Sequence, residues 1–339
     1  MNMKEWISRI IESPVRIAIP IMTHPGIEYL GKTVKEVVTD GTVHFEAIKA
    51  LNNMYPPAAC TVIMDLTVEA EVFGAEVVFP ENEIPTVTGR LVYDIDSVKN
   101  LEIPDMTKGR LPEYILANKL TAENIKDKPV FGGCIGPFSL AGRLYDMSEL
   151  MMACYTEPEI AKLLLAKCAT FLKDYCTELK KQGIQGIVIA EPAAGLLSNE
   201  GCQEFSSEYI KPIVEALQDD EFIIILHNCG NKGHCTDAML STQAKGYHFG
   251  NMMNMELALD QCPAGTLVLG NLDPVGVFKN ASVEQMESEV FGLLDKTRLH
   301  PNFVLSSGCD IPPHIPLENI EAFYRALDKF NEQSSQIVK

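Results

Sequence analysis

Short, fully apolar stretches alternate with longer amphipathic stretches along most of the chain, and this alternation limits the possible folds more than any other feature. The apolar stretches are too short for helices, are rich in β-branched residues and are bounded by Gly, Pro or Asn, which is typical of buried strands. The sequence predicts such strands at Val15–Ile21, Cys60–Leu66, Val130–Ile135, Gly186–Ala190, Phe222–Leu226, Gly246–Phe249, Thr266–Leu269 and Phe303–Leu305.

The stretches between these runs have the periodicity of helices. We predict helices at Glu157–Gln182, Ser207–Gln218, Ser282–Lys296 and Leu317–Glu332. The longest places one apolar face toward the core, made of Ile160, Leu164, Cys168, Phe171, Leu172 and Tyr175. The N-terminal segment MNMKEWISRIIESP predicts an amphipathic surface helix, and Val77–Asp96 predicts a hairpin-like insertion near the barrel mouth.

Apolar strands separated by helices imply a parallel sheet that is covered on both faces. About eight such strands are most economically arranged as a closed (β/α)8 TIM barrel. An open doubly wound sheet is the alternative, but no GxGxxG follows the first strand, and no GxxxxGK[ST] loop is present. We therefore predict an α/β fold: a single barrel domain over residues 1–339 with an N-terminal helical extension.

Charge and composition limit the partners of the chain. The net charge is −18, from 28 Lys and Arg against 46 Asp and Glu, which argues against non-specific nucleic-acid binding and against an anionic membrane surface. No apolar run is long enough for a transmembrane helix, and the N-terminal segment lacks the continuous apolar core of a signal peptide. We predict a cytoplasmic protein with no nucleic-acid or membrane partner, whose ten cysteines are mostly thiols.

Polar side chains gather at the ends of the predicted strands, and in a barrel those ends form the face that carries active sites. A single polar residue at such a position is as consistent with a helix cap or a turn as with chemistry. Acids, amides, an imidazole and thiols on one rim are more informative together. We predict Asp65 and Glu191 as catalytic residues, and His24, Asn251, Asn271 and Asp273 as substrate-binding residues.

The pair His227-x-Cys229 at the end of one strand is the sharpest of these features. Residues i and i+2 of an extended segment point to the same side, so the imidazole and the thiol can reach one ion. Cys309, after a later strand, supplies a third donor. One nitrogen and two sulfur ligands suit Zn²⁺, and three protein ligands leave a position for substrate. We predict His227, Cys229 and Cys309 as ligands of a catalytic zinc.

Three other residues are weaker candidates for the metal. His234 and Cys235 are expected in the helix that follows the strand, and His248 is expected inside a strand as a hydrogen-bonded core or rim histidine. Thiolate ligands donate charge, so a zinc ion held by them suits the binding of an external thiol more than the activation of water. Binding lowers the pKa of that thiol and provides a nucleophile for an activated methyl group.

Several motifs resemble those of the uroporphyrinogen decarboxylase superfamily, and together they cover nearly the whole chain. They are Met64–Phe79 (MDLTVEAEVFGAEVVF), Gly136–Leu144 (GPFSLAGRL), His227–Gly230 (HNCG), Gly270–Pro274 (GNLDP) and Ser306–Phe323 (SSGCDIPPHIPLENIEAF). The HxC pair with a distant Cys resembles, within this superfamily, the zinc-dependent methylcobamide:coenzyme M methyltransferase branch.

The resemblance implies a (β/α)8 barrel and a zinc ion that binds the acceptor thiol. It implies a methyl donor supplied as methylcobalamin, usually on a separate corrinoid protein, and a small thiol such as coenzyme M as acceptor. Carried over to this sequence, the zinc ligands are again His227, Cys229 and Cys309. Asp65 matches the acid that decarboxylase members hold over the substrate pyrroles.

The chain also departs from its relatives. Decarboxylases have an Arg-rich segment near the N-terminus, and the matching stretch here, Ile19–Ile27, contains no Arg, which disfavours a porphyrinogen substrate. Similar zinc methyltransferases that use homocysteine have a Glu ligand on the strand after HxC, and this strand ends here at Asn251. The fourth ligand is left open between Glu191, water and the substrate. No DxHxxG motif is present, so we expect the corrinoid on a partner.

Two other functional hypotheses compete with methyl transfer. One is a metal-free, decarboxylase-like lyase that acts on a carboxylated substrate through Asp65. The other is a non-catalytic corrinoid-binding or scaffold subunit with a structural zinc. The sequence leaves open whether the acceptor is coenzyme M, a folate or another thiol, what the upstream methyl source is, and whether the chain is a monomer or a homodimer.

Overall fold

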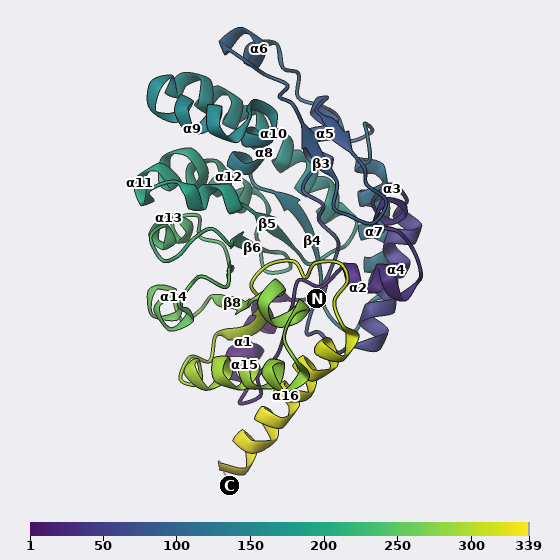
Figure 1. Ribbon diagram of the computed structural model, residues 1–339. Coiled ribbons are helices and arrows are strands. Elements are labelled where there is room, and N and C mark those ends of the chain that lie inside the picture. Colours follow the sequence, from purple (N-terminus) through teal and green to yellow (C-terminus); the bar gives the residue numbers. More distant parts are fainter. Residues whose placement is uncertain (338–339) are drawn as a thin grey trace.

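A curled parallel sheet lies at the centre of the molecule, and helices surround it in the computed structural model, which describes residues 1–337 (Figure 1). Within the described residues the sheet has seven strands in the order β1-β4-β5-β6-β7-β8-β9. Their bounds are β1 Cys60–Thr61, β4 Val130–Ile135, β5 Gly186–Ala190, β6 Ile223–Asn228, β7 Gly246–Phe249, β8 Leu267–Leu272 and β9 Phe303–Ser307.

The eighth position of the predicted barrel is occupied by an extended segment and not by a strand. Residue Ala18 forms a single parallel bridge with Leu305 of β9. The amide of Ile19 donates to the carbonyl of Leu305, and the amide of Ala58 donates to the carbonyl of Ala18. The segment thus bonds both to β9 and to the chain that leads into β1. The α/β, TIM-barrel-like architecture is confirmed, whereas the described residues form a curled sheet of seven strands and not the predicted closed ring of eight.

The predicted strand bounds agree with the structure where the whole strand is apolar. Strands β4, β5 and β7 have the predicted limits. Strands β6, β8 and β9 continue further, into His227, Asn271 and Ser307, because parallel pairing with their neighbours runs on through polar residues. Strand β1 is much shorter than the predicted Cys60–Leu66. After Val62, whose amide still donates to the carbonyl of Phe131, the chain turns into the loop of Asp65.

An apolar cluster fills the barrel interior below the polar strand ends. It includes Val188 of β5, Ile225 of β6 and Leu269 of β8, all nearly inaccessible to solvent. Helix α1 (Met3–Glu12) covers the other end of the barrel and packs the Trp6 ring edge-on against Phe131, with ring centroids 5.8 Å apart. The predicted N-terminal amphipathic helix is present, and its apolar face is buried against the barrel.

The helices largely follow the sequence periodicity. All six predicted core residues of the longest helix are buried, and the predicted Ser207–Gln218 helix begins at Glu208 after one wider turn at Gln203–Ser207. The helices are α2 His24–Tyr29, α3 Val34–Thr39, α4 Gly41–Met54, α5 Val68–Phe73, α6 Ile95–Asn100, α7 Leu111–Asn124, α8 Pro137–Tyr145, α9 Met147–Thr156, α10 Pro158–Lys181, α11 Asn199–Cys202, α12 Glu208–Leu217, α13 Thr236–Leu240, α14 Met255–Gln261, α15 Val283–Lys296 and α16 Leu317–Ile337; shorter turns are η1 Pro192–Leu196, η2 Gln203–Ser207 and η3 Pro274–Lys279.

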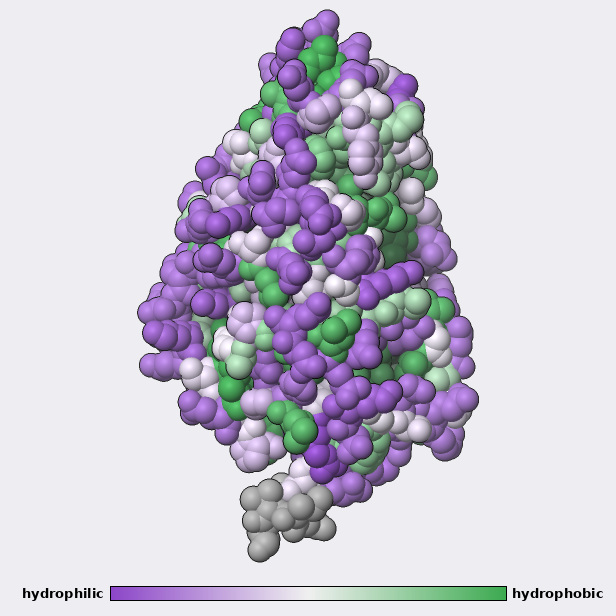
Figure 2. All heavy atoms as spheres, turned by 90° about the vertical axis from the view of Figure 1, so that its left-hand side faces the viewer, coloured by the Kyte–Doolittle hydropathy of each residue, from purple (hydrophilic) through white to green (hydrophobic). Residues whose placement is uncertain are grey.

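The insertion that the sequence predicts as hairpin-like contains two short antiparallel strands, β2 (Glu76–Val78) and β3 (Thr86–Thr88). The face that carries α9, α11, α13 and α14 is mostly hydrophilic, with small, separated hydrophobic areas (Figure 2). None of the helices in the described part of the chain has the length and apolar character needed to cross a membrane.

Candidate active site

Strand β6 carries His227 near its end, and the strand geometry turns this side chain toward the barrel interior. Ile223 and Ile225, four and two residues earlier, belong to the interior cluster, so the alternation along a strand directs His227 the same way. Cys229 follows directly after β6, again two residues on. Cys309 lies just after β9, across the rim.

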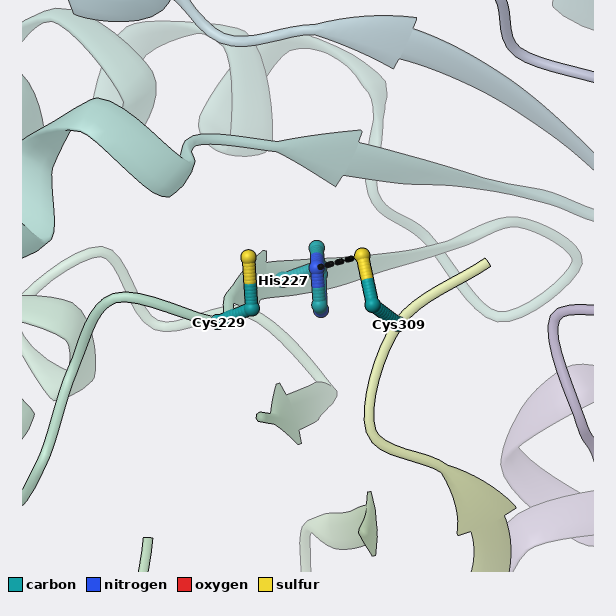
Figure 3. Close-up of side chains that lie close together, drawn as sticks. All are labelled: His227, Cys229 and Cys309. Carbon is teal, nitrogen blue, oxygen red and sulfur yellow. Dashed lines mark hydrogen bonds between the residues drawn. The ribbon is translucent and has the colours of Figure 1, made fainter. Parts of the chain in front are cut away.

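The three predicted metal ligands come together (Figure 3). One donor atom from each of His227, Cys229 and Cys309 lies within 4.8 Å of the others. The sulfur of Cys309 is 3.7 Å from Nε2 of His227. A tetrahedral zinc with ordinary bond lengths needs a nitrogen–sulfur separation of about 3.6 Å. The donor types and their spacing therefore fit a zinc ion.

The two thiols of the cluster are electrostatically unequal. A side-chain hydrogen bond from Cys309 lowers the pKa of Cys229, against the effect of burial. The same hydrogen bond, together with burial, raises the pKa of Cys309. Cys229 is thus the more acidic of the two thiols. Both cysteines are partly exposed, whereas His227 is buried.

Glycines let the surrounding loops approach the cluster closely. A Cβ atom at Gly250 would lie 2.6 to 2.8 Å from backbone and side-chain atoms of Cys229. A Cβ atom at Gly308, next to Cys309, would lie 2.6 Å from the amide nitrogen of Asn251. Real side chains do not tolerate such contacts, so the loop after β7 packs against both thiol-bearing loops because these positions are glycine.

The three weaker metal candidates, His234, Cys235 and His248, are not part of the cluster of His227, Cys229 and Cys309. His248 is in β7, as predicted, and its ring nitrogens bond to His227 and Ser306. Burial, with the neighbouring His227 ring, holds the pKa of His248 well below its ordinary value. The prediction that His234 and Cys235 lie in a helix is wrong. They precede α13, because Asn231 accepts a hydrogen bond from the amide of Cys235 and keeps this segment in a turn.

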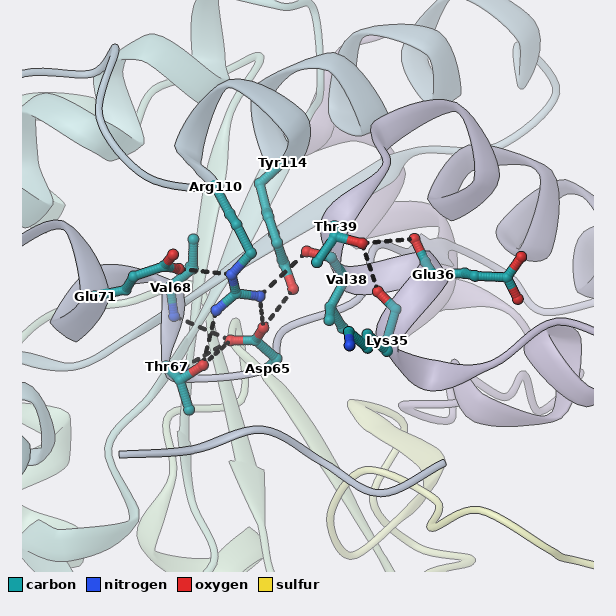
Figure 4. A network of polar contacts seen from close by, with 10 residues as sticks. All are labelled: Lys35, Glu36, Val38, Thr39, Asp65, Thr67, Val68, Glu71, Arg110 and Tyr114. Carbon is teal, nitrogen blue, oxygen red and sulfur yellow. Dashed lines mark hydrogen bonds and ion pairs between the residues drawn. The ribbon is translucent and has the colours of Figure 1, made fainter. Parts of the chain in front are cut away.

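Asp65 lies at the turn after β1 and is completely engaged by its neighbours (Figure 4). One carboxylate oxygen accepts hydrogen bonds from the amide and hydroxyl of Thr67 and from the amide of Val68. The other is ion-paired with Arg110 and accepts a hydrogen bond of 2.8 Å from the Tyr114 hydroxyl. Burial alone would raise the pKa of Asp65, but Arg110 and these donors outweigh it and lower the pKa.

Arg110 ties three helices together around Asp65. Its guanidinium also bonds to Glu71 of α5 at 2.6 Å, to the backbone carbonyl of Val38 of α3 and to the Thr67 hydroxyl. Arg110 itself immediately precedes α7. The two ends of this ion pair are 45 residues apart in the sequence, so no local pattern indicates that Asp65 and Arg110 meet.

Glu191 follows β5 and closes the start of α8. Its two carboxylate oxygens accept hydrogen bonds from the amides of Phe138 and Ser139 and from the Ser206 hydroxyl. Burial raises the pKa of Glu191 to about 7, although these donors lower it in part. The backbone amide of Glu191 donates to the carbonyl of His227, so this acid lies beside strand β6, which carries His227.

Glu69 is a buried acid that the sequence patterns did not single out. It is 1% exposed, and one of its oxygens accepts from the amide of Ile135 while the other has no hydrogen-bond partner. Burial raises its pKa to about 7. Its sequence signal was weak, because the motif MDLTVEAEVFGAEVVF reads equally well as the start of an amphipathic helix with Glu69 on its polar face.

The predicted substrate-binding residues fall into two places. Asn251, Asn271 and Asp273 line one cavity of about 600 Å³ between the loop after β7 and α15. The Asn271 side chain donates to the carbonyls of Gly250 and Met253, and Asp273 caps the turn that starts at Pro274. His24 lies apart from this cavity. It is buried at the start of α2, 3.1 Å from the carbonyl of Ile311.

The fold and this site define a TIM-barrel-like α/β protein with three side chains that could hold a metal ion at the carboxyl ends of its strands. The chain belongs to the uroporphyrinogen decarboxylase (URO-D) family, whose model matches residues 4–330, and it is an enzyme of that family. It is 28% identical over 267 residues to the methylcobamide:CoM methyltransferase MtbA of Methanosarcina acetivorans, covering 78% of this chain and 77% of that one. It is 25% identical over 287 residues to the uroporphyrinogen decarboxylase of Legionella pneumophila (strain Lens), covering 82% and 80%. The family resemblance found in the sequence is confirmed.

Solved structures agree with this fold. A methyltransferase from Methanosarcina mazei superposes with a TM-score of 0.86 at 21% identity and covers 97% of this chain and 99% of that one. A B12-independent methionine synthase from Shewanella sp. W3-18-1 superposes with a TM-score of 0.58 at 14% identity, covering 88% and 89%. At these identities the likeness establishes the architecture.

Proposed function

We propose that this protein is a zinc-dependent methyltransferase that moves a methyl group from a methylated corrinoid to a small thiol such as coenzyme M. The observation that carries the proposal is the meeting of His227, Cys229 and Cys309 with the spacing of a tetrahedral zinc site. The likeness to methylcobamide:CoM methyltransferases of Methanosarcina supports it. A bound zinc ion would lower the pKa of the acceptor thiol and so make it a nucleophile at neutral pH.

The residues of the cluster have separate tasks in this proposal. His227 offers Nε2 from inside the barrel, while the sulfurs of Cys229 and Cys309 close the site from the two loops. Cys229 is the thiol with the lowered pKa, so it is the first to offer a thiolate. Three protein donors leave one position for the acceptor thiol. Glu191 is disfavoured for that position, because both of its oxygens already accept hydrogen bonds from the start of α8 and from Ser206.

The acids therefore act as positioning residues in our proposal. Glu191 links the start of α8 to the strand that carries His227. Asp65 holds Arg110 and Tyr114 at the opposite side of the rim. We propose the cavity lined by Asn251, Asn271 and Asp273 as the place for the non-reacting part of the substrate, because the loop of Asn251 packs directly against Cys229. His24 is proposed to support the Cys309 loop, since it lies 3.4 Å from Asp310.

The surroundings of the reaction are also part of the proposal. We propose one barrel domain whose eighth position is the segment 17–21, a separate corrinoid protein as methyl donor, and a cytoplasmic location. Free thiols support the location, because all ten cysteines are unpaired in the structure. A net charge of −18 speaks against nucleic acid and anionic membranes as partners. The oligomeric state is open between monomer and homodimer.

A decarboxylase-like lyase is the second candidate, supported by relatives such as the Legionella decarboxylase. It would depend on Asp65, whose carboxylate is already ion-paired with Arg110 and bonded to Tyr114. A carboxylate whose oxygens are already engaged by Arg110 and Tyr114 is poorly placed to accept or donate a proton. The two candidates differ in their need for zinc, so one set of measurements separates them.

The test begins with zinc content, measured by elemental analysis on protein purified without a metal-affinity tag. We expect about one zinc per chain, by the stoichiometry of a three-ligand site, and its loss in Cys309→Ala. Cys262→Ala is the matched control, because Cys262 is a buried thiol outside the cluster. Thiols are then screened with methylcobalamin. Full methyl transfer by zinc-free protein, or turnover of uroporphyrinogen without metal, would reject the proposal.

A further inference from the structure

A chain of buried hydrogen bonds continues from the metal-binding histidine into the barrel wall. Nδ1 of His227 lies 2.7 Å from Nδ1 of His248, and Nε2 of His248 lies 2.9 Å from the hydroxyl of Ser306. The Ser306 hydroxyl donates to the carbonyl of Ile19 at 2.7 Å. All three side chains are at most 2% exposed. Water is therefore not available to replace any of these partners.

The direction of each hydrogen bond follows from the fixed end of the chain. The only hydroxyl proton of Ser306 points at a backbone carbonyl, which can only accept. The contact between Ser306 and His248 therefore needs the proton on Nε2 of His248, and a neutral His248 then has a lone pair on Nδ1. That lone pair accepts the proton of Nδ1 of His227. Nε2 of His227, the atom 3.7 Å from the Cys309 sulfur, is left without a proton.

We propose that His248 and Ser306 are positioning residues that hold His227 in the tautomer with Nδ1 protonated, so that its Nε2 lone pair faces the sulfurs of Cys229 and Cys309. A histidine can bind a metal only through an unprotonated nitrogen, and the hydrogen bond at its other nitrogen decides which one that is. The inference rests on the metal site of the proposed function, and it adds the residues that prepare this site before any ion arrives.

The sheet explains why these residues meet. His227 and His248 are register partners on the neighbouring parallel strands β6 and β7, so their inward side chains lie side by side. Ser306 is on β9, three residues before Cys309. The hydrogen-bond chain therefore connects the two strands that lead to the metal-binding residues, and a shift of one strand would disturb both the tautomer and the ligand spacing.

Zinc affinity, measured by competition with a chromophoric chelator, tests this inference without methyl transfer. We expect Ser306→Ala to weaken zinc binding about tenfold and His248→Leu up to about 100-fold, the range seen for outer partners of metal-binding histidines. Ser307→Ala is the matched control, since the buried hydroxyl of Ser307 accepts from the amide of Ile21 and takes no part in the hydrogen bonds that join His227, His248 and Ser306. His248→Asn should recover part of the loss, because its side-chain oxygen replaces the Nδ1 acceptor. Equal losses in Ser306→Ala and Ser307→Ala would overturn the inference.

The tautomer itself can be read from the imidazole nitrogen-15 shifts of zinc-free protein with labelled histidine. We expect His227 to carry its proton on Nδ1 in the wild type and to show a mixture of tautomers in Ser306→Ala. A proton on Nε2 in the wild type would contradict the inference, even if a variant fails to fold. This readout also separates the two claims: a protein with the expected tautomer but no methyl transfer retains the positioning role and loses the proposed function.

Discussion

The molecule has two polar clusters at the carboxyl ends of its strands, and they differ in how many partners their reactive atoms have. Around Asp65, each charge is matched: Arg110, Tyr114 and the backbone of Thr67 and Val68 use both carboxylate oxygens. Around His227, the two sulfurs bond to each other, and the sulfur of Cys309 also lies 3.7 Å from Nε2 of His227. The first cluster has partners for both carboxylate oxygens, whereas in our proposal the second is completed by an ion.

This difference teaches how a strand-end motif becomes a site. A buried ion pair with all its hydrogen bonds made has little to offer a substrate, because any new partner must displace an existing one. A group of soft donors at the spacing of a metal site has lone pairs directed at one point. The end of a strand therefore carries a structural ion pair, Asp65 with Arg110, in one place and a candidate reaction centre in the other.

The largest expected effect is at the incomplete cluster. Cys229→Ala and Cys309→Ala each remove one of three ligands, so we expect most of the zinc to be lost and methyl transfer to fall by more than the ~100-fold that outer partners reach. Elemental analysis and an assay with methylcobalamin and a thiol measure both effects. Cys262→Ala should retain zinc and activity. If the two ligand variants keep stoichiometric zinc, the donors of the site are other residues.

The next effect concerns the complete cluster, and there we expect a loss of stability without a loss of zinc. Arg110→Met leaves Asp65 as an uncompensated buried charge, which costs about 3–5 kcal/mol of unfolding free energy. Adding Asp65→Asn should restore part of it, because the side-chain oxygen still serves Thr67 and Val68 while the charge is gone. Denaturant unfolding gives the free energies, and elemental analysis gives the zinc content. An equal fall in zinc content would show that the two clusters depend on each other.

The sequence predicts the local part of this comparison well. The strands β4, β5 and β7 and the trio of His227, Cys229 and Cys309 follow from apolar runs and from the two-residue alternation of a strand. The strand bounds and the pair His227 and Cys229 are read over a few neighbouring residues. The place of Cys309 follows from the barrel, which brings the carboxyl ends of distant strands to one rim.

The parts that sequence analysis missed depend on pairing between distant segments. The contact of His227 with His248 depends on the register of β6 against β7. The ion pair between Asp65 and Arg110 depends on the packing of two segments that are distant in the sequence. The segment Val15–Ile21 is apolar enough for a strand, yet it forms only one bridge within the described residues, between Ala18 and Leu305. Its backbone hydrogen bonds are divided between β9 and the residues before β1, so it forms no regular ladder with either. No pattern within a short window contains this information.

A smaller effect is expected from a buried acid that has no partner for one oxygen. Burial raises the pKa of Glu69 to about 7 in the folded protein, from an ordinary value of 4.5. The protonated form is favoured by folding, so this stabilisation is present below the unfolded pKa and is lost as the pH rises through the folded value. The loss is on the order of 3 kcal/mol at 1.36 kcal/mol per unit.

The variant Glu69→Gln isolates this contribution, because its side-chain oxygen can still accept from the amide of Ile135. Below the unfolded pKa of 4.5 the variant and the wild type should be similarly stable, the variant should gain on the wild type as the pH rises from there to about 7, and the difference should be constant above that. Unfolding free energies over this pH range provide the measurement. A constant difference at all pH values would mean that folding does not shift the pKa of Glu69.

The smallest effect is expected at Asp273, a partly exposed residue of the cavity that Asn251 and Asn271 also line. Its carboxylate accepts from the amides of Val275 and Gly276, and its exposure allows water to replace it in part. Asp273→Ala should therefore cost about 1 kcal/mol, and Asp273→Asn only a few tenths, because Asn caps a turn nearly as well. Thermal and denaturant unfolding resolve the two. Equal losses would show that the negative charge stabilises this turn and not the cap geometry, which would bring Asp273 closer in kind to the charge-matched Asp65.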